Sequence, residues 1–237
     1  MISKLVASLA DALEGVPDGA TVLVGGFGLA GHPVALLEGL LEQGARDLTI
    51  VSNNAGNGDT GLAALLAAGR VRKIVCSFPR QSDSWHFDRL YREGSLELEL
   101  VPQGNLAERL RAAGAGIGAF YTPTGAGTDL ADGKETRVIG GRVHVLEFPI
   151  RGDIALIGGW CGDRWGNLTY RKTSRNFNPL MAAAADLTIA QVDRVVELGA
   201  LDPEAVATPA LYVDRVVEVA TRQWVRAVAP ENGVAVS

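Results

Sequence analysis

The chain has 237 residues, 47% of them hydrophobic and 21% charged, which supports a buried core and excludes a disordered chain. A net charge of −5 with no basic stripe argues against a nucleic-acid partner, and the lack of a run of about 18 apolar residues argues against a membrane span. Residues 1–15 mix charges into an apolar pattern, and there are two cysteines. We therefore expect an amphipathic helix rather than a signal peptide, and a reducing, cytoplasmic location.

The first half of the chain alternates apolar, strand-like runs with helical segments. Strands are predicted at residues 21–27, 48–52, 71–78 and 96–101, and helices at 33–43, 61–68, 84–93 and 106–113. Strands separated by helices of about ten residues are typical of βαβ units. This half therefore predicts a mainly parallel sheet with helices packed on it.

The pattern changes after Thr122, where glycine and threonine predict a loop over residues 122–128. Residues 137–148 are typical of a hairpin that turns at Gly140-Gly141. Further strands are predicted at 154–158 and 187–192, and 213–220 fits a strand or a helix. The expected fold is α/β, an open, mainly parallel twisted sheet flanked by helices, with a hairpin insertion in the second half. We expect one domain over 1–229 and a loose tail over 230–237.

Residues 18–33 read as a strand, a glycine loop and the start of a helix. Glycine lacks Cβ, so a ligand or another backbone can approach closely, and a helix N-terminus offers N–H donors to an anion or a carbonyl oxygen. Gly26, Gly28 and Gly31 fit the dinucleotide spacing G-x-G-x-x-G, but the second strand is not followed by the acid that such a site uses. A tight structural turn is the alternative.

Amide side chains follow two of the predicted strands. Asn53 and Asn54 come after the second strand and Gln103 after the fourth, at the sheet edge where ligands bind in parallel sheets. Amides at this edge can donate hydrogen bonds to a carbonyl oxygen or an oxyanion, although a turn would also explain the asparagine pair. Arg80, after the third strand, could grip a carboxylate with two hydrogen bonds or be a solvated loop charge.

The residues themselves indicate no nucleophile and no metal site. Ser82 and Ser84 lack a recognisable base, and Cys76 ends a buried strand, as a packed thiol does. The three histidines are scattered, without a metal-binding spacing. The pattern thus predicts an edge suited to polarising a carbonyl group.

Residues 18–33 match the signature of the family I CoA-transferases. That signature is Asp-Gly, two free positions, three aliphatic residues, Gly-Gly-Phe, three free positions, Gly, one free position and Pro. In this family an A-type and a B-type polypeptide form one enzyme, and further stretches of this chain resemble the A-type. They are residues 47–56, 101–109, 120–128, 163–168 and 174–178. Because they occur in order over most of the chain, the resemblance is specific.

The resemblance implies a ping-pong reaction in which a glutamate of the B-type subunit carries CoA as a thioester, within an A2B2 assembly. CoA then enters as a thioester substrate, and no separate cofactor is expected. Gln103 is expected to help form the oxyanion hole. The residues expected to line the substrate or to face the nucleophile are Gly25, Gly26, Phe27, Gly28, Gly31, Asn53 and Asn54. The tail triplet Glu231-Asn232-Gly233 is similar to the sequence around that glutamate, but it follows Pro230 outside any second domain.

Within the family, residues 76–84 and 195–199 are most similar to the A-type subunits that act on 3-oxoadipate with succinyl-CoA. From the residues alone we add that Arg80 is suited to the distal carboxylate of this six-carbon diacid. The alternatives are acetoacetate or a short-chain fatty acid as acceptor and, more distantly, a nucleotide- or sugar-phosphate-binding module. His32 receives no role at this stage.

Overall fold

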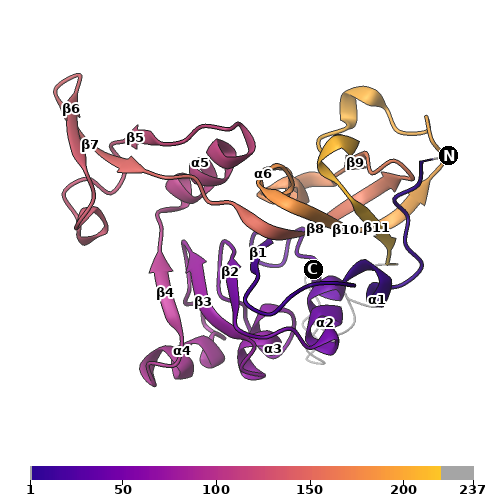
Figure 1. The fold of residues 1–237 in the computed structure, drawn as a ribbon, viewed down its shortest axis with the longest axis horizontal. Helices are drawn as coiled ribbons and strands as arrows, with labels where there is room; N and C mark the ends of the chain where they lie inside the picture. Colours follow the sequence, from indigo (N-terminus) through magenta and orange to yellow (C-terminus); the bar gives the residue numbers. More distant parts are fainter. Residues whose placement is uncertain (1, 220–237) are drawn as a thin grey trace, which may run out of the picture.

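The computed structural model describes residues 2–219. Its main sheet has eight strands in the order β11-β10-β8-β1-β2-β3-β4, with β9 paired to β8 (Figure 1). The strands are β1 (Thr21–Val24), β2 (Leu48–Val51), β3 (Val71–Cys76), β4 (Glu97–Leu100), β8 (Gly152–Asp163), β9 (Leu168–Thr169), β10 (Ala185–Val196) and β11 (Arg215–Glu218). All pairings except β8 with β9 are parallel, which confirms the predicted sheet.

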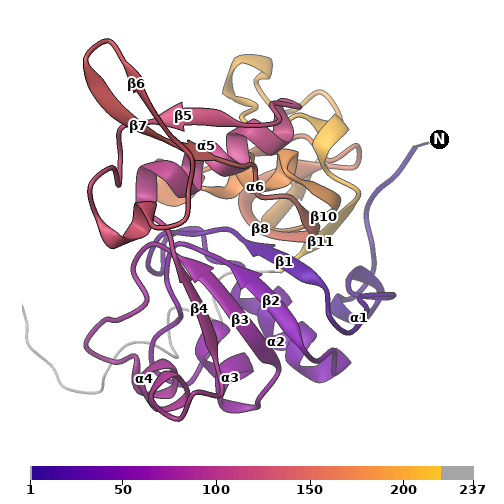
Figure 2. The same cartoon turned by 60° about the vertical axis from the view of Figure 1, so that its left-hand side comes forward.

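Helices cover both faces of this sheet (Figure 2). They are α1 (Leu9–Ala12), α2 (Val34–Gln43), α3 (Leu62–Ala67), α4 (Trp85–Arg92), α5 (Gln103–Gly114) and α6 (Asn178–Ala183). Ile50 belongs to the core with α2 and α3, whereas its neighbour Val51 belongs to a second core with α5 and α6. Successive strand residues point to opposite faces, so the near-continuous apolar strands reflect burial on both sides.

The chain reverses its direction of winding at β1. It runs from β1 outward through β2, β3 and β4, and then returns to add β8, β10 and β11 on the other side of β1. In parallel sheets, ligands bind beyond the carboxyl ends of the strands at such a switch point. In Figure 1 the arrowheads of β2, β3 and β4 point toward α5, so the loops between these elements form the edge of interest.

A second sheet carries the predicted hairpin away from the main sheet (Figure 1). It contains β5 (Phe120–Thr122), β6 (Thr136–Ile139) and β7 (Arg142–Glu147), antiparallel in the order β5-β7-β6. Gly140 and Gly141 both have positive φ, 58° and 78°, as a two-residue hairpin turn requires. The hairpin is confirmed, and β5 is its unpredicted third strand.

Several expected boundaries were wrong. Residues 1–15 do not form a long helix, because within the described part Val6 N donates to Val216 O of β11, at 2.9 Å, and only the four residues of α1 are helical. Helix α5 begins at Gln103, three residues earlier than predicted, directly after Pro102. Strands β8 and β10 each span 12 residues, more than predicted.

The remaining predictions on organisation have separate outcomes. The strand alternative for residues 213–220 is right, since β11 lies there. Elements β9 and α6 were not anticipated. The domain boundary at 229, the tail 230–237 and the triplet Glu231-Asn232-Gly233 lie outside the described residues. Within residues 2–219, no helix has the length and apolarity needed to cross a bilayer, and no three or more metal-binding side chains gather.

Candidate active site

The glycine loop after β1 is a tight reversal of the chain. Phe27 and Ala30 pair their backbones, with N–O distances of 3.0 and 3.1 Å. Gly26, Gly28 and Gly31 have φ values of 113°, 59° and 66°, a region that strongly favours glycine. The interpretation as a structural turn is therefore right about the geometry, and the space beside Gly28 is open.

Two of these glycines are required by packing within the chain itself. A Cβ on Gly25 would lie 1.8 Å from Asn178 Oδ1, and one on Gly31 would lie 2.3 Å from the Ser174 carbonyl oxygen. Both distances are far inside van der Waals contact. The close approach that these glycines permit is thus between two segments of the chain.

Asn176 and Asn178 hold the loop in this shape. Gly26 N donates to Asn176 Oδ1 at 3.1 Å, and Asn176 Nδ2 donates to Ala30 O at 2.9 Å. Asn178 is fully buried, and its Nδ2 donates to Gly31 O at 3.1 Å. These two roles were not predicted from the sequence, although both asparagines lie in the family-like stretch 174–178.

His32 follows the glycine loop and bonds back to Gly25, the residue directly after β1. Its Nδ1 lies 3.1 Å from Gly25 O; because a carbonyl oxygen only accepts, Nδ1 carries the hydrogen. Burial lowers the pKa of His32 to about 4, although this hydrogen bond opposes the shift. His32 is therefore neutral at physiological pH, with Nε2 unprotonated.

The predicted amides Asn53 and Gln103 do meet at the sheet edge. Gln103 Nε2 donates to Asn53 Oδ1 at 2.8 Å, and Ser77 Oγ, after β3, lies 2.8 Å from the same oxygen. Asn53 is only 3% exposed. Ser77, which lies one residue beyond β3, was not among the predicted site residues.

The side-chain oxygen of Asn54 stabilises a turn. Its Oδ1 accepts a hydrogen bond from Gly56 N at 2.9 Å, and the residue is 4% exposed. The turn interpretation is therefore right for this oxygen. Among residues 2–219, no hydrogen bond is formed by Nδ2 of either Asn53 or Asn54. Within these residues, Arg70 Nε is the single side-chain nitrogen or oxygen that is both closed to solvent and without a hydrogen bond. The amide nitrogens of Asn53 and Asn54 are therefore accessible to solvent.

The loops after β2 and β3 are fastened together and form one rim of the edge. Gly58 N donates to Asp83 O at 2.9 Å, and the side chains of Asn57 and Gln81 are hydrogen bonded. Arg80 lies on this rim with its side chain 58% exposed, and its Nε donates to Asp88 of α4 at 2.7 Å. Its two Nη nitrogens form no hydrogen bond within the described chain, so they remain available to a carboxylate.

No nucleophile is bonded to this edge in residues 2–219. None of the hydrogen bonds of Asn53, Asn54 or Gln103 involves a carboxylate. Burial raises the pKa of the Cys76 thiol to about 12, despite an opposing backbone hydrogen bond from Phe78. A protonated thiol is a poor nucleophile, so Cys76 is a packed side chain, as its position at a strand end suggested.

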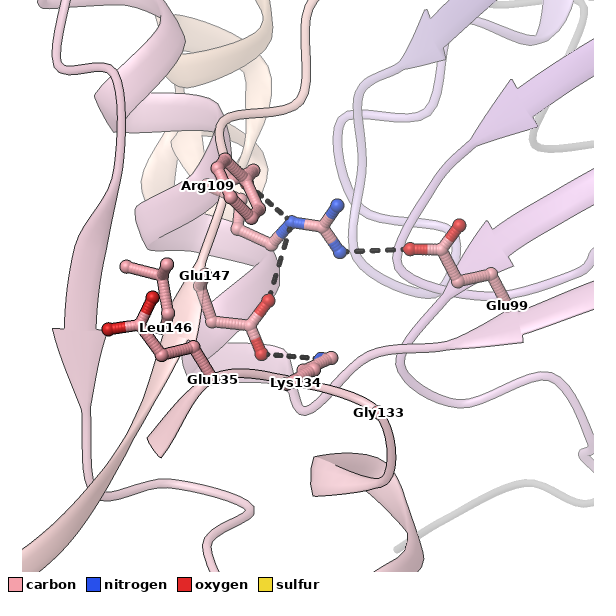
Figure 3. A pocket seen from close by; sticks show the side chains of 8 residues that line it. Glu99, Arg109, Gly133, Lys134, Glu135, Leu146 and Glu147 are labelled. Atoms are coloured by element: carbon pink, nitrogen blue, oxygen red, sulfur yellow. Dashed lines mark hydrogen bonds and ion pairs between the residues drawn. The ribbon is translucent and has the colours of Figure 1, made fainter. Parts of the chain in front are cut away.

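A pocket of about 300 Å³ lies elsewhere, between β4, α5 and the second sheet (Figure 3). Glu147 is 3% exposed at its centre, with Lys134 Nζ at 2.7 Å and Arg109 Nε at 3.8 Å. Arg109 Nη1 also reaches Glu99 at 2.9 Å. Burial opposes ionisation of Glu99, but Lys73 and Arg109 together hold the pKa of its carboxyl below the usual value. Glu147 and Glu99 are each paired with a cation, and these ion pairs join the second sheet to α5 and β4.

Comparison with known proteins identifies the class of protein. The profile of the family described as coenzyme A transferase matches residues 6–219, and the chain belongs to this family. It is 67% identical to the A-type subunit of the 3-oxoadipate CoA-transferase of Pseudomonas putida, over 92% of this chain and 95% of that one. It is 62% identical to the polypeptide of the same description from Acinetobacter baylyi, over 92% and 96%. It is 52% identical to the A-type subunit of the succinyl-CoA:3-ketoacid coenzyme A transferase of Xanthomonas campestris, over 92% and 90%.

Solved structures share the fold. The glutaconate coenzyme A-transferase of Acidaminococcus fermentans matches with a TM-score of 0.81 at 22% identity, over 92% of this chain and 76% of that one. An acyl-CoA transferase of Escherichia coli O157:H7 matches with a TM-score of 0.80 at 24% identity, over 92% of this chain and 47% of that one. The chain therefore spans about half the length of the second protein. The prediction of a CoA-transferase fold and family is confirmed.

Proposed function

We propose that this chain is the A-type subunit of an enzyme that transfers CoA from succinyl-CoA to 3-oxoadipate, with the catalytic glutamate on the B-type subunit. The observation that carries the proposal is the graded similarity: 67% and 62% identity to relatives described as 3-oxoadipate CoA-transferases, against 52% and 47% to relatives described as 3-ketoacid transferases. We further propose an A2B2 assembly, a cytoplasmic location and no cofactor besides the CoA thioester itself.

The proposed reaction has four balanced steps. The glutamate of the B-type subunit attacks the succinyl carbonyl to give an anhydride and releases CoA thiolate, which then attacks the glutamyl carbonyl to form an enzyme thioester and free succinate. The carboxylate of 3-oxoadipate attacks that thioester and releases the thiolate again. The thiolate finally attacks the 3-oxoadipyl carbonyl and restores the glutamate.

Each step places negative charge on a carbonyl oxygen, and the edge described above is suited to stabilise it. The open Nδ2 groups of Asn53 and Asn54 come from nearly buried side chains, so they are held in place before the substrate arrives. Such preorganised donors each contribute about 2.7–4 kcal/mol to transition-state stabilisation. The open space beside Gly28 is where we propose that the glutamate of the B-type subunit approaches.

The test is to coexpress the chain with a candidate B-type polypeptide and follow the enolate absorbance of the 3-oxoacyl-CoA product. We expect kcat/KM for 3-oxoadipate to exceed that for acetoacetate by about tenfold or more, and no activity from either polypeptide alone. Equal or higher kcat/KM for acetoacetate would favour the alternative acceptor. Activity of the isolated chain would contradict the division of the site between two polypeptides.

Binding of nucleotides or sugar phosphates is the remaining alternative, and calorimetry tests it directly. We expect no heat of binding when NAD, ATP or sugar phosphates are titrated into the chain at concentrations near 1 mM, since the second strand ends in Ser52-Asn53-Asn54 and offers no acid to a ribose. Saturable binding of any of them would revive this class.

A further inference from the structure

We propose that Ser77 is a positioning residue that fixes the amide of Asn53 with its nitrogen turned toward the substrate. The inference deepens the proposed function and depends on it for its kinetic test. It assigns a role to a residue that lies next to the predicted amides but makes no contact with the reacting atoms in our scheme.

The Asn53 side chain has two ends with opposite surroundings. Its Oδ1 accepts from Gln103 Nε2 and from Ser77 Oγ, both at 2.8 Å. Its Nδ2 forms no hydrogen bond in the described chain and is accessible from the surface, although the residue as a whole is buried. An unpartnered donor on a nearly buried amide indicates that its partner comes from outside residues 2–219.

An asparagine amide can turn by 180° about its last bond, which would exchange the acceptor oxygen and the donor nitrogen. In a turned amide, Nδ2 would face Gln103 Nε2, donor against donor. The Ser77 hydroxyl would lose its bond to Oδ1 and would have to redirect its hydrogen to Asn53 O, 3.1 Å from Oγ, in order to accept from the amide. The donor toward the substrate would then become an acceptor.

The backbone around Asn53 is also fixed by the end of β3. Phe78 N and Ser77 N donate to Asn53 O at 3.0 and 3.3 Å. The end of β3 therefore holds both the carbonyl and the side chain of Asn53, and Ser77 contacts both, since its Oγ lies 2.8 Å from Oδ1 and 3.1 Å from the carbonyl oxygen. Gln103 lies exposed in the first turn of α5, whereas Ser77 is half-buried directly after β3.

The experiment uses the complex with the B-type subunit and the matched pair Ser77→Thr and Ser77→Val, which differ by a hydroxyl in place of a methyl group. We expect Ser77→Val to lower kcat about fivefold with KM and the melting temperature little changed, which corresponds to the loss of one hydrogen bond. Ser77→Thr should stay within about twofold of the wild type. A loss that is the same in both variants would assign Ser77 to packing and overturn the proposal.

A second comparison separates positioning from general structural support. In an Asn53→Ala background, Ser77→Val should have no further effect on kcat, because the residue through which Ser77 acts is gone. A full additional loss there would overturn the proposal. Rates are measured with 3-oxoadipate and with acetoacetate; a complex that uses only acetoacetate would refute the acceptor that we propose and still test Ser77.

A crystal structure of the Ser77→Val complex tests the same point without any activity. We expect the Asn53 amide to be turned or to occupy two orientations, as assigned from its hydrogen-bond partners. An amide that keeps the single orientation found with Ser77 would overturn the proposal, whichever substrate the enzyme uses.

Discussion

Two regions of the described chain concentrate polar side chains, and they satisfy them in opposite ways. In the pocket under the second sheet, Glu147, Arg109, Glu99 and Lys134 pair with one another (Figure 3). At the edge of the main sheet, by contrast, the amide oxygen of Asn53 accepts two hydrogen bonds, and its amide nitrogen forms none within residues 2–219. Buried polar groups are normally paired, so we base the proposed binding site on the open nitrogen and not on the cavity.

The sharpest way to test this comparison is to remove the open amide. We expect Asn53→Ala to lower kcat by 10²–10³, about 2.7–4 kcal/mol, as the loss of a preorganised donor does. Steady-state kinetics of the complex with the B-type subunit measure it. Asn53→Asp is the control for shape, and it should be at least as slow because a carboxylate cannot donate and repels a developing oxyanion. An unchanged kcat in Asn53→Ala would remove this residue from the site.

The pocket should respond in stability and not in catalysis. Glu147→Ala leaves Arg109 and Lys134 without their buried partner, and we expect the free energy of unfolding to fall by about 3 kcal/mol. Urea denaturation measures the change. Glu108→Ala is the matched control, because Glu108 forms an exposed ion pair with Arg111 and its removal should cost less than about 1 kcal/mol. A large loss of kcat in Glu147→Ala with unchanged stability would indicate that the active site lies in the pocket.

The pH dependence of stability tests whether the folded glycine loop requires a neutral His32 ring. Its pKa in the folded protein, about 4, lies below the ordinary 6.5, so between these values the unfolded chain binds a proton that the folded chain does not. Stability is therefore complete above pH 6.5 and decreases as the pH falls toward 4, by up to about 2 kcal/mol between pH 7 and 5. Urea denaturation of the wild type and His32→Asn at both pH values isolates this part, and an identical pH dependence would contradict it.

The smallest expected effect concerns the choice of acceptor. Arg80→Ala should lower kcat/KM for 3-oxoadipate by about tenfold, through the loss of a charged hydrogen bond to the distal carboxylate, and leave acetoacetate unaffected. Arg89→Ala is the control, since Arg89 is an exposed arginine of α4 paired with Glu93. Full 3-oxoadipate activity in Arg80→Ala would eliminate the role of Arg80 and leave acceptor selection to other residues.

Local patterns predicted the main sheet and the edge at which its amides lie. Apolar runs such as 48–52 and 71–78, separated by helical segments, indicated βαβ units, and placement after strands indicated that Asn53 and Gln103 lie at the same edge of the sheet. The parts that failed depend on distant partners. Residues 1–15 have helical spacing, but Val6 instead bonds to Val216, and no local pattern reports a partner about 210 residues away.

The roles of Asn176, Asn178 and Glu147 were missed for a similar reason. The two asparagines act on the glycine loop from about 150 residues away, and their local sequence resembles an ordinary turn. Glu147 ends strand β7, which begins with exposed residues, and Glu147 is paired with Arg109 of α5 and with Lys134. Such roles arise from tertiary packing, and a single sequence carries little local signal for them.

The bonds from Asn176 and Asn178 to the glycine loop have a consequence for the order in which the protein is made. During synthesis, β1 and its loop leave the ribosome long before residues 176–178 exist, and contacts of such long sequence separation form late in folding. Until then Gly26 and Gly31 lack the partners that shape the loop. A nascent chain that has not yet reached residue 176 therefore carries an unfinished glycine loop.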